Sequence, residues 1–163
     1  MPRPEIVQPT DKDYRFIPLT RGQVAIVDAS DYEWLNQWNW CALERKSSVG
    51  KFYALRRDGN KIVLMHVFIT GETGRDHKNG NGLDNRRSNL RKATPSQNMH
   101  NTDKPSTNTS GYKGVWLHSP GKWRSRIEIE GKRINSPLFS TPEAAAEFYI
   151  SLSRQAMGEF SRV

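Results

Sequence analysis

Hydrophobic and polar positions in the first part of the chain alternate as they do in short β-strands. Alternation over residues 14–27 predicts two strands, and strand-like runs recur at 52–55 and 61–64. We therefore expect a small α+β module over residues 14–63. The polar, proline-rich residues 1–13 are expected to form a flexible arm.

Three of the five tryptophans lie close together in this module. Just before them, Ser30 and Glu33 have the spacing of a helix-capping box, which predicts a short helix with Ser30 as its cap. Because aromatic side chains bury large areas, we expect the tryptophans in the core. The single cysteine, Cys41, is expected to be a small buried hydrophobe. The tryptophans concerned are Trp34, Trp38 and Trp40.

The middle of the chain predicts a compact ββα unit over residues 64–103. A short helix over 65–70 should end at Gly71, and a long polar loop containing a strand edge should follow. Leu90 begins an expected return strand. Thr94 is followed by a proline and, three positions after the threonine, by a glutamine, which together are a strong signal for a helix start.

After a polar linker at 104–110, residues 111–163 predict a three-stranded antiparallel sheet and a helix. The strands are expected over 114–117, 122–129 and 133–139. The helix should begin at a Ser-Thr-Pro-Glu sequence, and its apolar positions recur at helical spacing, so they should face the sheet. These apolar positions are Ala144, Ala145, Phe148, Tyr149, Leu152 and Ala156.

Composition adds a strong positive charge to this picture. The 163 residues carry a formal net charge of +8, and most of the excess lies after residue 74. This asymmetry favours a polyanionic partner such as DNA, although a basic protein without such a partner has the same composition. One cysteine excludes a disulfide framework. Without an apolar run of membrane-spanning length or a signal-peptide pattern, we expect a cytoplasmic protein with no membrane or small-molecule partner.

The segment between residues 75 and 91 combines a carboxylate, an imidazole and several amides with basic side chains. A hard metal ion prefers oxygen ligands, so Asp76 and the amide of Asn98 could hold one Mg²⁺, or alternatively Mn²⁺. His77 could activate a water molecule, because imidazole titrates near neutral pH. Its other ring nitrogen would need a partner, for which Asn89 or a backbone carbonyl could serve.

The same residues also fit an ordinary turn in a basic loop. Asn-Gly pairs stand at 79–80 and 81–82, and asparagine and glycine are residues that turns favour. From the residues alone, the catalytic and the turn interpretations have equal support.

The run DHKNGNGLDNRRSNLR, followed by TPSQN, resembles the HNH motif of phage-type and intron-encoded homing endonucleases, which form a ββα-metal site. The resemblance covers about residues 64–100. It implies that His77 is the general base and that Asn89 braces the loop and the histidine. It also implies that Asp76 and Asn98 are the metal ligands. The basic residues of the segment are then expected to contact DNA: Lys78, Arg86, Arg87 and Arg91.

Two neighbouring positions need separate comment. Arg75 stands where many members of the resembled family carry an apolar residue, which would alter local packing rather than chemistry. His66 follows a methionine in a pair that also resembles the family. A structural role is favoured for it, with an additional metal ligand or a DNA contact as the alternative.

Residues 110–160 resemble the DNA-binding domain of the Apetala/ethylene-response-factor family through SGYKGVW, GKWR and FSTPEAA. In that family a three-stranded sheet lies in the major groove. Independently, Arg124 and Arg126 share one face of a predicted strand and could contact phosphates or guanine edges, although a merely solvated basic sheet is the alternative. Plant members have arginines near the first strand where this chain does not, so no target sequence is implied. The matching positions are Lys113, Trp116, His118, Lys122, Trp123, Arg124, Arg126, Lys132 and Arg133.

Together these observations predict a metal-dependent, site-specific DNA endonuclease of homing type. Double-stranded DNA is the expected partner, and one divalent ion is the expected cofactor. Because each chain has one expected active centre, a monomer should make a nick, and a dimer would be needed for paired cuts. The expected state is a monomer or weak dimer. Two alternatives stay open: a sequence-specific DNA-binding protein without catalysis, and a non-specific nuclease.

Overall fold

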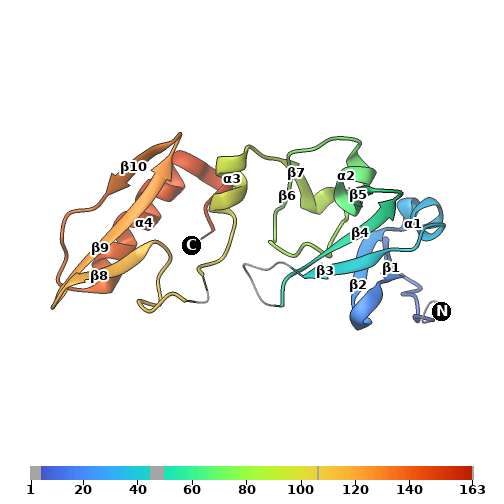
Figure 1. The fold of residues 1–163 in the computed structure, drawn as a ribbon, viewed down its shortest axis with the longest axis horizontal. Helices are drawn as coiled ribbons and strands as arrows, with labels where there is room; N and C mark the ends of the chain where they lie inside the picture. The colour runs from blue at the N-terminus through green and yellow to red at the C-terminus, as the bar shows by residue number, and fades with distance from the viewer. Residues whose placement is uncertain (1–4, 45–49, 106, 163) are drawn as a thin grey trace. The chain divides into compact units, whose positions relative to one another are not determined.

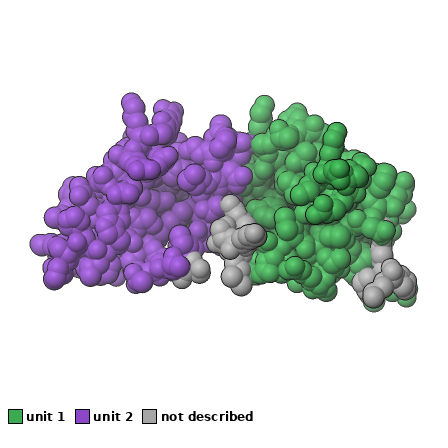
Figure 2. Space-filling view, viewed as in Figure 1, with its two compact units in different colours: residues 1–92 green, residues 93–163 purple. Residues whose placement is uncertain are grey.

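Both halves of the chain mix short strands with helices, which confirms the expected α+β class. The computed structural model describes residues 5–44, 50–105 and 107–162. Contacts divide the chain into two units, residues 1–92 and 93–163, which Figure 2 colours separately. No helix within the described ranges is long and apolar enough to cross a membrane.

The alternation at the start of unit 1 produces a β-hairpin. β1 (Tyr14–Pro18) pairs antiparallel with β2 (Val24–Asp28), and the short 3-10 turn η1 (Thr20–Gly22) lies between them. The alternate residues Ile17, Ala25 and Val27 are fully buried, which confirms the predicted strands. In the segment before β1, the side-chain amide of Gln8 bonds to both main-chain polar groups of Phe16.

The first helix begins earlier than the capping signal predicts. α1 (Ala29–Asn36) follows β2 directly, so Ser30 lies inside its first turn and is not the cap. Asp28 stands at the cap position, but its side chain makes no cap hydrogen bond. Its carboxylate instead accepts a hydrogen bond from the main-chain N–H of Arg87, 59 residues further along the chain. A long-range contact has therefore replaced the local cap.

A second, three-stranded sheet completes the N-terminal part of unit 1. β3 (Cys41–Glu44), β4 (Phe52–Asp58) and β5 (Lys61–Leu64) are antiparallel, with β4 in the centre (Figure 1). α2 (Met65–Thr70) follows β5 without a break. It ends, as predicted, at Gly71, whose φ of +70° is the left-handed conformation that terminates many helices.

Two of the core predictions for this region are wrong. Trp40 is buried and Trp34 packs against the core, but Trp38 is 42% exposed. The guanidinium of Arg56 covers one face of the Trp38 ring at 4.2 Å, so this tryptophan stacks on a cation near the surface. Cys41 is exposed, because β3 turns Ala42 toward the core and therefore Cys41 to the opposite face.

A short strand pair closes unit 1. β6 (Arg75–His77) pairs antiparallel with β7 (Leu90–Lys92), and the 3-10 turn η2 (Arg87–Asn89) leads into β7. Leu90 belongs to the same hydrophobic core as buried residues of the hairpin, α1, β3, β4 and α2. Residues 14–63, predicted as a separate module, therefore share one core with the first part of the predicted ββα unit.

Unit 2 begins with the helix that the capping signal predicts. α3 (Pro95–His100) has Thr94 as its cap, and both reciprocal bonds of the capping box with Gln97 are present. Ala93, just before the cap, is buried with Met157 and Phe160 of the C-terminal end of the chain. The helix of the predicted ββα unit is thus built into unit 2.

The rest of unit 2 is a three-stranded antiparallel sheet covered by one helix. β9 (Lys122–Ile129) lies between β8 (Val115–Ser119) and β10 (Lys132–Asn135), as predicted. The third strand ends earlier than residue 139. It ends at Asn135, and the hydroxyl and N–H of the next residue, Ser136, bond to the main chain of β9. Further along, Phe139 pairs with β9 again through a single bridge to Trp123.

α4 (Pro142–Met157) packs on this sheet, and the 3-10 turn η3 (Gly158–Phe160) follows it. The cap is Thr141, whose hydroxyl accepts a hydrogen bond from Ala144 N. The prediction of Ala156 in the buried face is wrong, because Met157 turns inward beside Phe160 instead. The buried positions of the helix are Ala145, Ala146, Tyr149, Ser153 and Met157.

Close packing between α4 and the start of β8 should be visible in a pair of glycine substitutions. Gly114 and Gly121 both have φ near +70°, so alanine is strained by a similar amount at either. Only at Gly114 would a Cβ also lie 2.5 Å from the Tyr149 ring and 2.8 Å from Arg126 O. We expect Gly114→Ala to lower the free energy of unfolding by about 1–3 kcal/mol more than Gly121→Ala. Urea unfolding measures both, and equal losses would contradict this packing.

Candidate active site

The two central motif residues are buried at the end of β6. Asp76 and His77 are 5% and 4% exposed, and they lie opposite Arg91 and Leu90 of β7. Successive residues of a regular strand point to opposite faces, so a carboxylate and an imidazole in sequence reach one substrate only where the strand is irregular. β6 ends at His77, and a turn follows in which Gly80 N donates to His77 O.

Three side chains surround the imidazole of His77. The ring of Tyr53, from β4, lies 5.8 Å away between centroids, and that of His66, from α2, lies 5.0 Å away, both edge to face. The third is Asn85, whose Oδ1 lies 3.3 Å from Nε2 of His77. Gly82 brings the loop close to this platform, because a Cβ there would meet the Tyr53 ring at 2.7 Å. The ring therefore has a fixed orientation.

This environment keeps both histidines neutral. Burial lowers the pKa of His77, and the Asn85 bond and the charges of Asp76 and Asp84 oppose this effect without cancelling it. Burial, followed by the nearness of His77, lowers the pKa of His66 to about 4. At neutral pH the His77 imidazole therefore has a lone pair on one nitrogen, which is the state that a general base requires.

Asp76 is paired across the strands. Its Oδ2 accepts hydrogen bonds from Nε and Nη2 of Arg91 at 3.2 and 3.1 Å, and both side chains are buried. Arg91, which the sequence analysis expected to contact DNA, thus has an internal partner. In the described part of the chain, no group of three or more His, Cys, Asp or Glu residues is arranged to hold a metal ion. A single carboxylate fits a hard ion such as Mg²⁺ that retains several waters.

Asn89 holds the loop that follows β6. Its Nδ2 donates to Asn79 Oδ1 and to Asp84 O, at 3.0 and 2.7 Å, and its Oδ1 accepts from Asn79 N. Lys78 N donates to Asn89 O. Asn89 or a backbone carbonyl was expected as the partner of the imidazole, and the structure places Oδ1 of Asn85 next to Nε2. The side chain of Asn89 therefore contacts the loop that carries Asn85.

The loop is also joined to the N-terminal hairpin by main-chain bonds. Ile26 N donates to Leu83 O at 2.8 Å, and Asn85 N donates to Ile26 O at 2.7 Å. These two bonds add a short parallel strand contact to β2, centred on Ile26 and Asp84. The predicted N-terminal module therefore supports the site directly.

The two arginines of the loop have acidic partners. Arg87 makes two bonds to the carboxylate of Asp31, at 2.8 and 3.0 Å, and is 53% exposed in its side chain. Arg86 makes two bonds to Asp84. Burial alone would raise the pKa of Asp84, but its contacts with Arg86 and Asn79 outweigh this and lower it.

These acidic partners reduce the number of unneutralised cations that the loop could offer to DNA. Lys78 is exposed, and its Nζ donates to Ser88 O at 2.9 Å. Lys78 and the two arginines are the cations of this loop that are partly or fully exposed. A neutralised arginine still donates hydrogen bonds, but its net attraction for a phosphate is reduced by the paired carboxylate.

Asn98, the expected second metal ligand, lies in the last turns of α3 and is exposed. α3 is held within unit 2 by polar contacts as well as by its apolar packing. Nε2 of His100 donates to Glu128 O of β9 at 2.7 Å. Asp76 and Asn98 belong to different units, so their joint role in metal binding stays a prediction.

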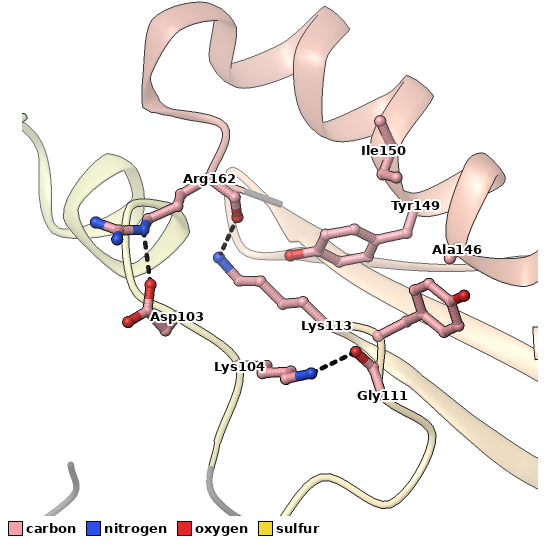
Figure 3. A pocket seen from close by; sticks show the side chains of 9 residues that line it. Asp103, Lys104, Gly111, Lys113, Ala146, Tyr149, Ile150 and Arg162 are labelled. Atoms are coloured by element: carbon pink, nitrogen blue, oxygen red, sulfur yellow. Dashed lines mark hydrogen bonds and ion pairs between the residues drawn. The ribbon is translucent and has the colours of Figure 1, made fainter. Parts of the chain in front are cut away.

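Lys113, expected to contact DNA, has a structural role. Its Nζ donates to His100 O, Thr102 O and Arg162 O at 2.6, 2.6 and 2.9 Å, which ties the end of α3 to the last residues of the chain. It borders a pocket of about 320 Å³ in which Arg162 pairs with Asp103 (Figure 3). Burial, against the charge of Asp103, lowers the pKa of Lys113 to about 8.

The remaining expected DNA contacts divide between the two faces of the C-terminal sheet. Trp123 packs against the core below α4, and Lys132 pairs with Ile129 and so shares that face. The opposite face carries Arg126, whose guanidinium lies 5.2 Å from the Trp116 ring centroid. His118 lies in a bulge of β8. The side chains on the uncovered face, by strand alternation, are Trp116, Lys122, Arg124, Arg126 and Arg133.

Sequence reasoning missed three residues of the site. Asn85 looked like another turn-forming asparagine, and Tyr53 like a strand residue of a separate module. Asp31 was assigned only to a helix. The sequence did contain a signal for Asn85. It follows Leu83 and Asp84 and is not followed by a glycine, unlike the Asn-Gly pairs that are typical of turns.

Two curated proteins are similar to the chain. Protein 3.8 of Escherichia phage T7 is 38% identical over 88 residues, which cover 53% of this chain and 72% of that protein. An uncharacterised HNH endonuclease of Acanthamoeba polyphaga mimivirus is 34% identical over 145 residues, which cover 86% of this chain and 74% of that protein. No protein-family model matches the chain, and no solved structure matches it.

The buried His66 should make stability depend on pH. The unfolded chain binds a proton on this group near pH 6.5, whereas the folded chain does so only near pH 4. Between these values the unfolded state binds more protons, so the free energy of unfolding should rise with pH across this window, by up to about 3 kcal/mol. His66→Phe should reduce this rise, and His118→Phe, at an exposed position, should not. Urea unfolding from pH 4 to 7 decides, and equal slopes in both variants would contradict the burial of His66.

Proposed function

The chain belongs to the HNH endonuclease family, and we propose that it is a metal-dependent, site-specific endonuclease of homing type that nicks double-stranded DNA. The observation that carries this proposal is the neutral, buried imidazole of His77, which is oriented by three side chains and directly follows the buried Asp76 in β6. The phage origin of one relative, protein 3.8 of Escherichia phage T7, supports the expectation of a phage-type protein.

His77 acts as the general base in the proposed reaction. One proton of a water molecule passes to the imidazole lone pair, and the water oxygen bonds to phosphorus. The bond from phosphorus to the 3′ oxygen breaks, and that oxygen takes a proton from solvent, which leaves a 3′-hydroxyl and a 5′-phosphate. General-base assistance of this kind contributes about 10²- to 10⁴-fold to a rate.

Asp76 and Asn98 are the residues proposed to hold the divalent ion. Their oxygen donors suit Mg²⁺, and Mn²⁺ is the alternative. When bound, the ion supplies positive charge to the phosphate and the leaving oxygen. Within the protein, the guanidinium of Arg91 offsets the negative charge of the Asp76 carboxylate, and its two hydrogen bonds to Oδ2 fix the orientation of that carboxylate. One such centre in each chain fits a nick, whereas paired cuts would need two chains.

The uncovered face of the C-terminal sheet is proposed to place the enzyme on DNA. Four cationic side chains on this face stand against one acidic residue, Glu128, which pairs with Arg133. Arg126 over the Trp116 ring adds a planar, amphipathic surface. Arginine forks of this kind contact phosphates and guanine edges in the major groove.

Cleavage of a random-sequence plasmid library tests the proposed function. We expect single-strand nicks at a limited set of sequences with Mg²⁺, and none with EDTA, when the ends are mapped by sequencing. His77→Ala should lower the nicking rate by about 10²- to 10⁴-fold, because water then lacks its base. DNA binding by this variant should stay near the wild-type value in a gel-shift assay.

The outcomes separate the alternatives. Nicking by His77→Ala at the wild-type rate would refute the base assignment. Binding without any nicking by the wild-type protein would favour a DNA-binding protein without catalysis, and cuts at every sequence would favour a non-specific nuclease.

A matched pair of substitutions tests the sheet. Arg126→Ala removes a cation from the uncovered face, and Lys132→Ala removes one from the face that α4 covers. We expect Arg126→Ala to weaken binding and to reduce the slope of log affinity against log salt concentration by about 1. Lys132→Ala should leave the slope unchanged. Equal effects of the two variants would exclude a one-sided DNA surface.

A further inference from the structure

One asparagine of the loop is fully buried and makes three directed contacts. Asn85 is 0% exposed. Its main-chain N–H donates to Ile26 O at 2.7 Å, its Nδ2 donates to Leu83 O at 3.1 Å, and its Oδ1 faces Nε2 of His77 at 3.3 Å. Each contact fixes a different part of the residue, so the amide plane has one available orientation.

The partner on the loop decides which end of the amide faces the histidine. A carbonyl oxygen only accepts hydrogen bonds, so the group next to Leu83 O must be the amide nitrogen. Oδ1 is therefore the atom that faces His77, and because Oδ1 also only accepts, Nε2 of the imidazole must donate. In the neutral ring the lone pair then lies on Nδ1.

We propose that Asn85 is a positioning residue that holds His77 as the Nε2–H tautomer, so that Nδ1 is the atom that accepts the proton of water. The catalytic part of this inference rests on the proposed function, whereas the tautomer does not. A residue that orients a catalytic histidine through its second nitrogen affects the rate without touching the substrate.

The surroundings of the ring support this assignment. Tyr53 and His66 pack edge to face against His77 and restrict the ring plane, but ring packing does not distinguish one nitrogen from the other. Asn85 supplies the contact that does. The main-chain N–H of Asn85 is bonded to Ile26 O of β2, which holds the backbone of this residue. Rotation of the side-chain amide would have to break the bond from Nδ2 to Leu83 O.

The tautomer is directly measurable. Long-range ¹H–¹⁵N spectra of the ¹⁵N-histidine-labelled full chain report which ring nitrogen carries the proton, and the His77 signals are those that disappear in His77→Ala. We expect a protonated Nε2 whose proton exchanges slowly with water. A wild-type ring that carries its proton on Nδ1 would overturn the proposal, whatever the variants do.

Substitutions in the same loop separate positioning from loop stability. Asn85→Ala should speed exchange of the Nε2 proton and lower the nicking rate by about 10- to 100-fold, with DNA binding unchanged. Asn85→Asp retains an acceptor toward Nε2 but loses the donor to Leu83 O, so it should restore only part of the protection and of the rate. The matched control is Asn81→Ala: Asn81 is exposed, and its Oδ1 accepts from Leu83 N without contacting His77. It should leave the Nε2 signal unchanged.

These results also distinguish the inference from the function on which it rests. A protected Nε2 proton that depends on Asn85, in a protein that does not nick, would retain the tautomer assignment and refute the nuclease proposal. Nicking that depends on His77 but an Nε2 signal that Asn85→Ala does not change would do the reverse. Equal exchange effects of Asn81→Ala and Asn85→Ala would show that loop stability alone is responsible, and would also overturn the proposal.

Discussion

The candidate site depends on a loop that has too few apolar side chains to be held in place by hydrophobic burial. Between β6 and η2 the chain is mostly asparagine, glycine and charged residues, with Leu83 as its one large apolar side chain. Two main-chain bonds to Ile26 therefore fix the loop to the first hairpin. Buried main-chain groups must be paired, so a loop that lies on a strand in this way has little freedom to move. The orientation of Asn85, and through it that of the imidazole, follows from this pairing.

Local signals in the sequence were sufficient for the elements that depend on local interactions. The capping box at Thr94, the left-handed Gly71 and the strand alternation all lie where predicted, because each involves residues within a few positions of one another. Motif spacing likewise pointed to one segment that the structure folds together, because Lys78 N, next to His77, donates to Asn89 O. The failures have a common cause. Asp28, at the start of the helix that Ser30 was predicted to cap, bonds to Arg87, and Asn85 bonds to Ile26. Each of these contacts joins residues more than fifty positions apart in the sequence, so no local pattern predicts it.

Charge alone overstates the surface available to nucleic acid. Arg91 is enclosed with Asp76, Lys113 is enclosed by three carbonyl oxygens, and Arg86 and Arg87 each carry a bidentate carboxylate. In the C-terminal sheet, strand alternation directs most of the cations to one face, together with Trp116, and most of the apolar groups to the other. A net charge of +8 is thus compatible with a small number of well-placed cations, rather than a uniformly basic surface.

The anchoring of α3 in unit 2 bears on how such proteins can be recombined. Ala93 packs with Met157 and Phe160, and His100 bonds to β9, so the helix inherits its position from the C-terminal sheet. A chimera joined at the linker after residue 103 would separate α3 from the scaffold that holds it. A crossover at residues 92–93 would keep each hydrophobic core whole, and Asn98 would then come with the C-terminal sheet instead of with the histidine.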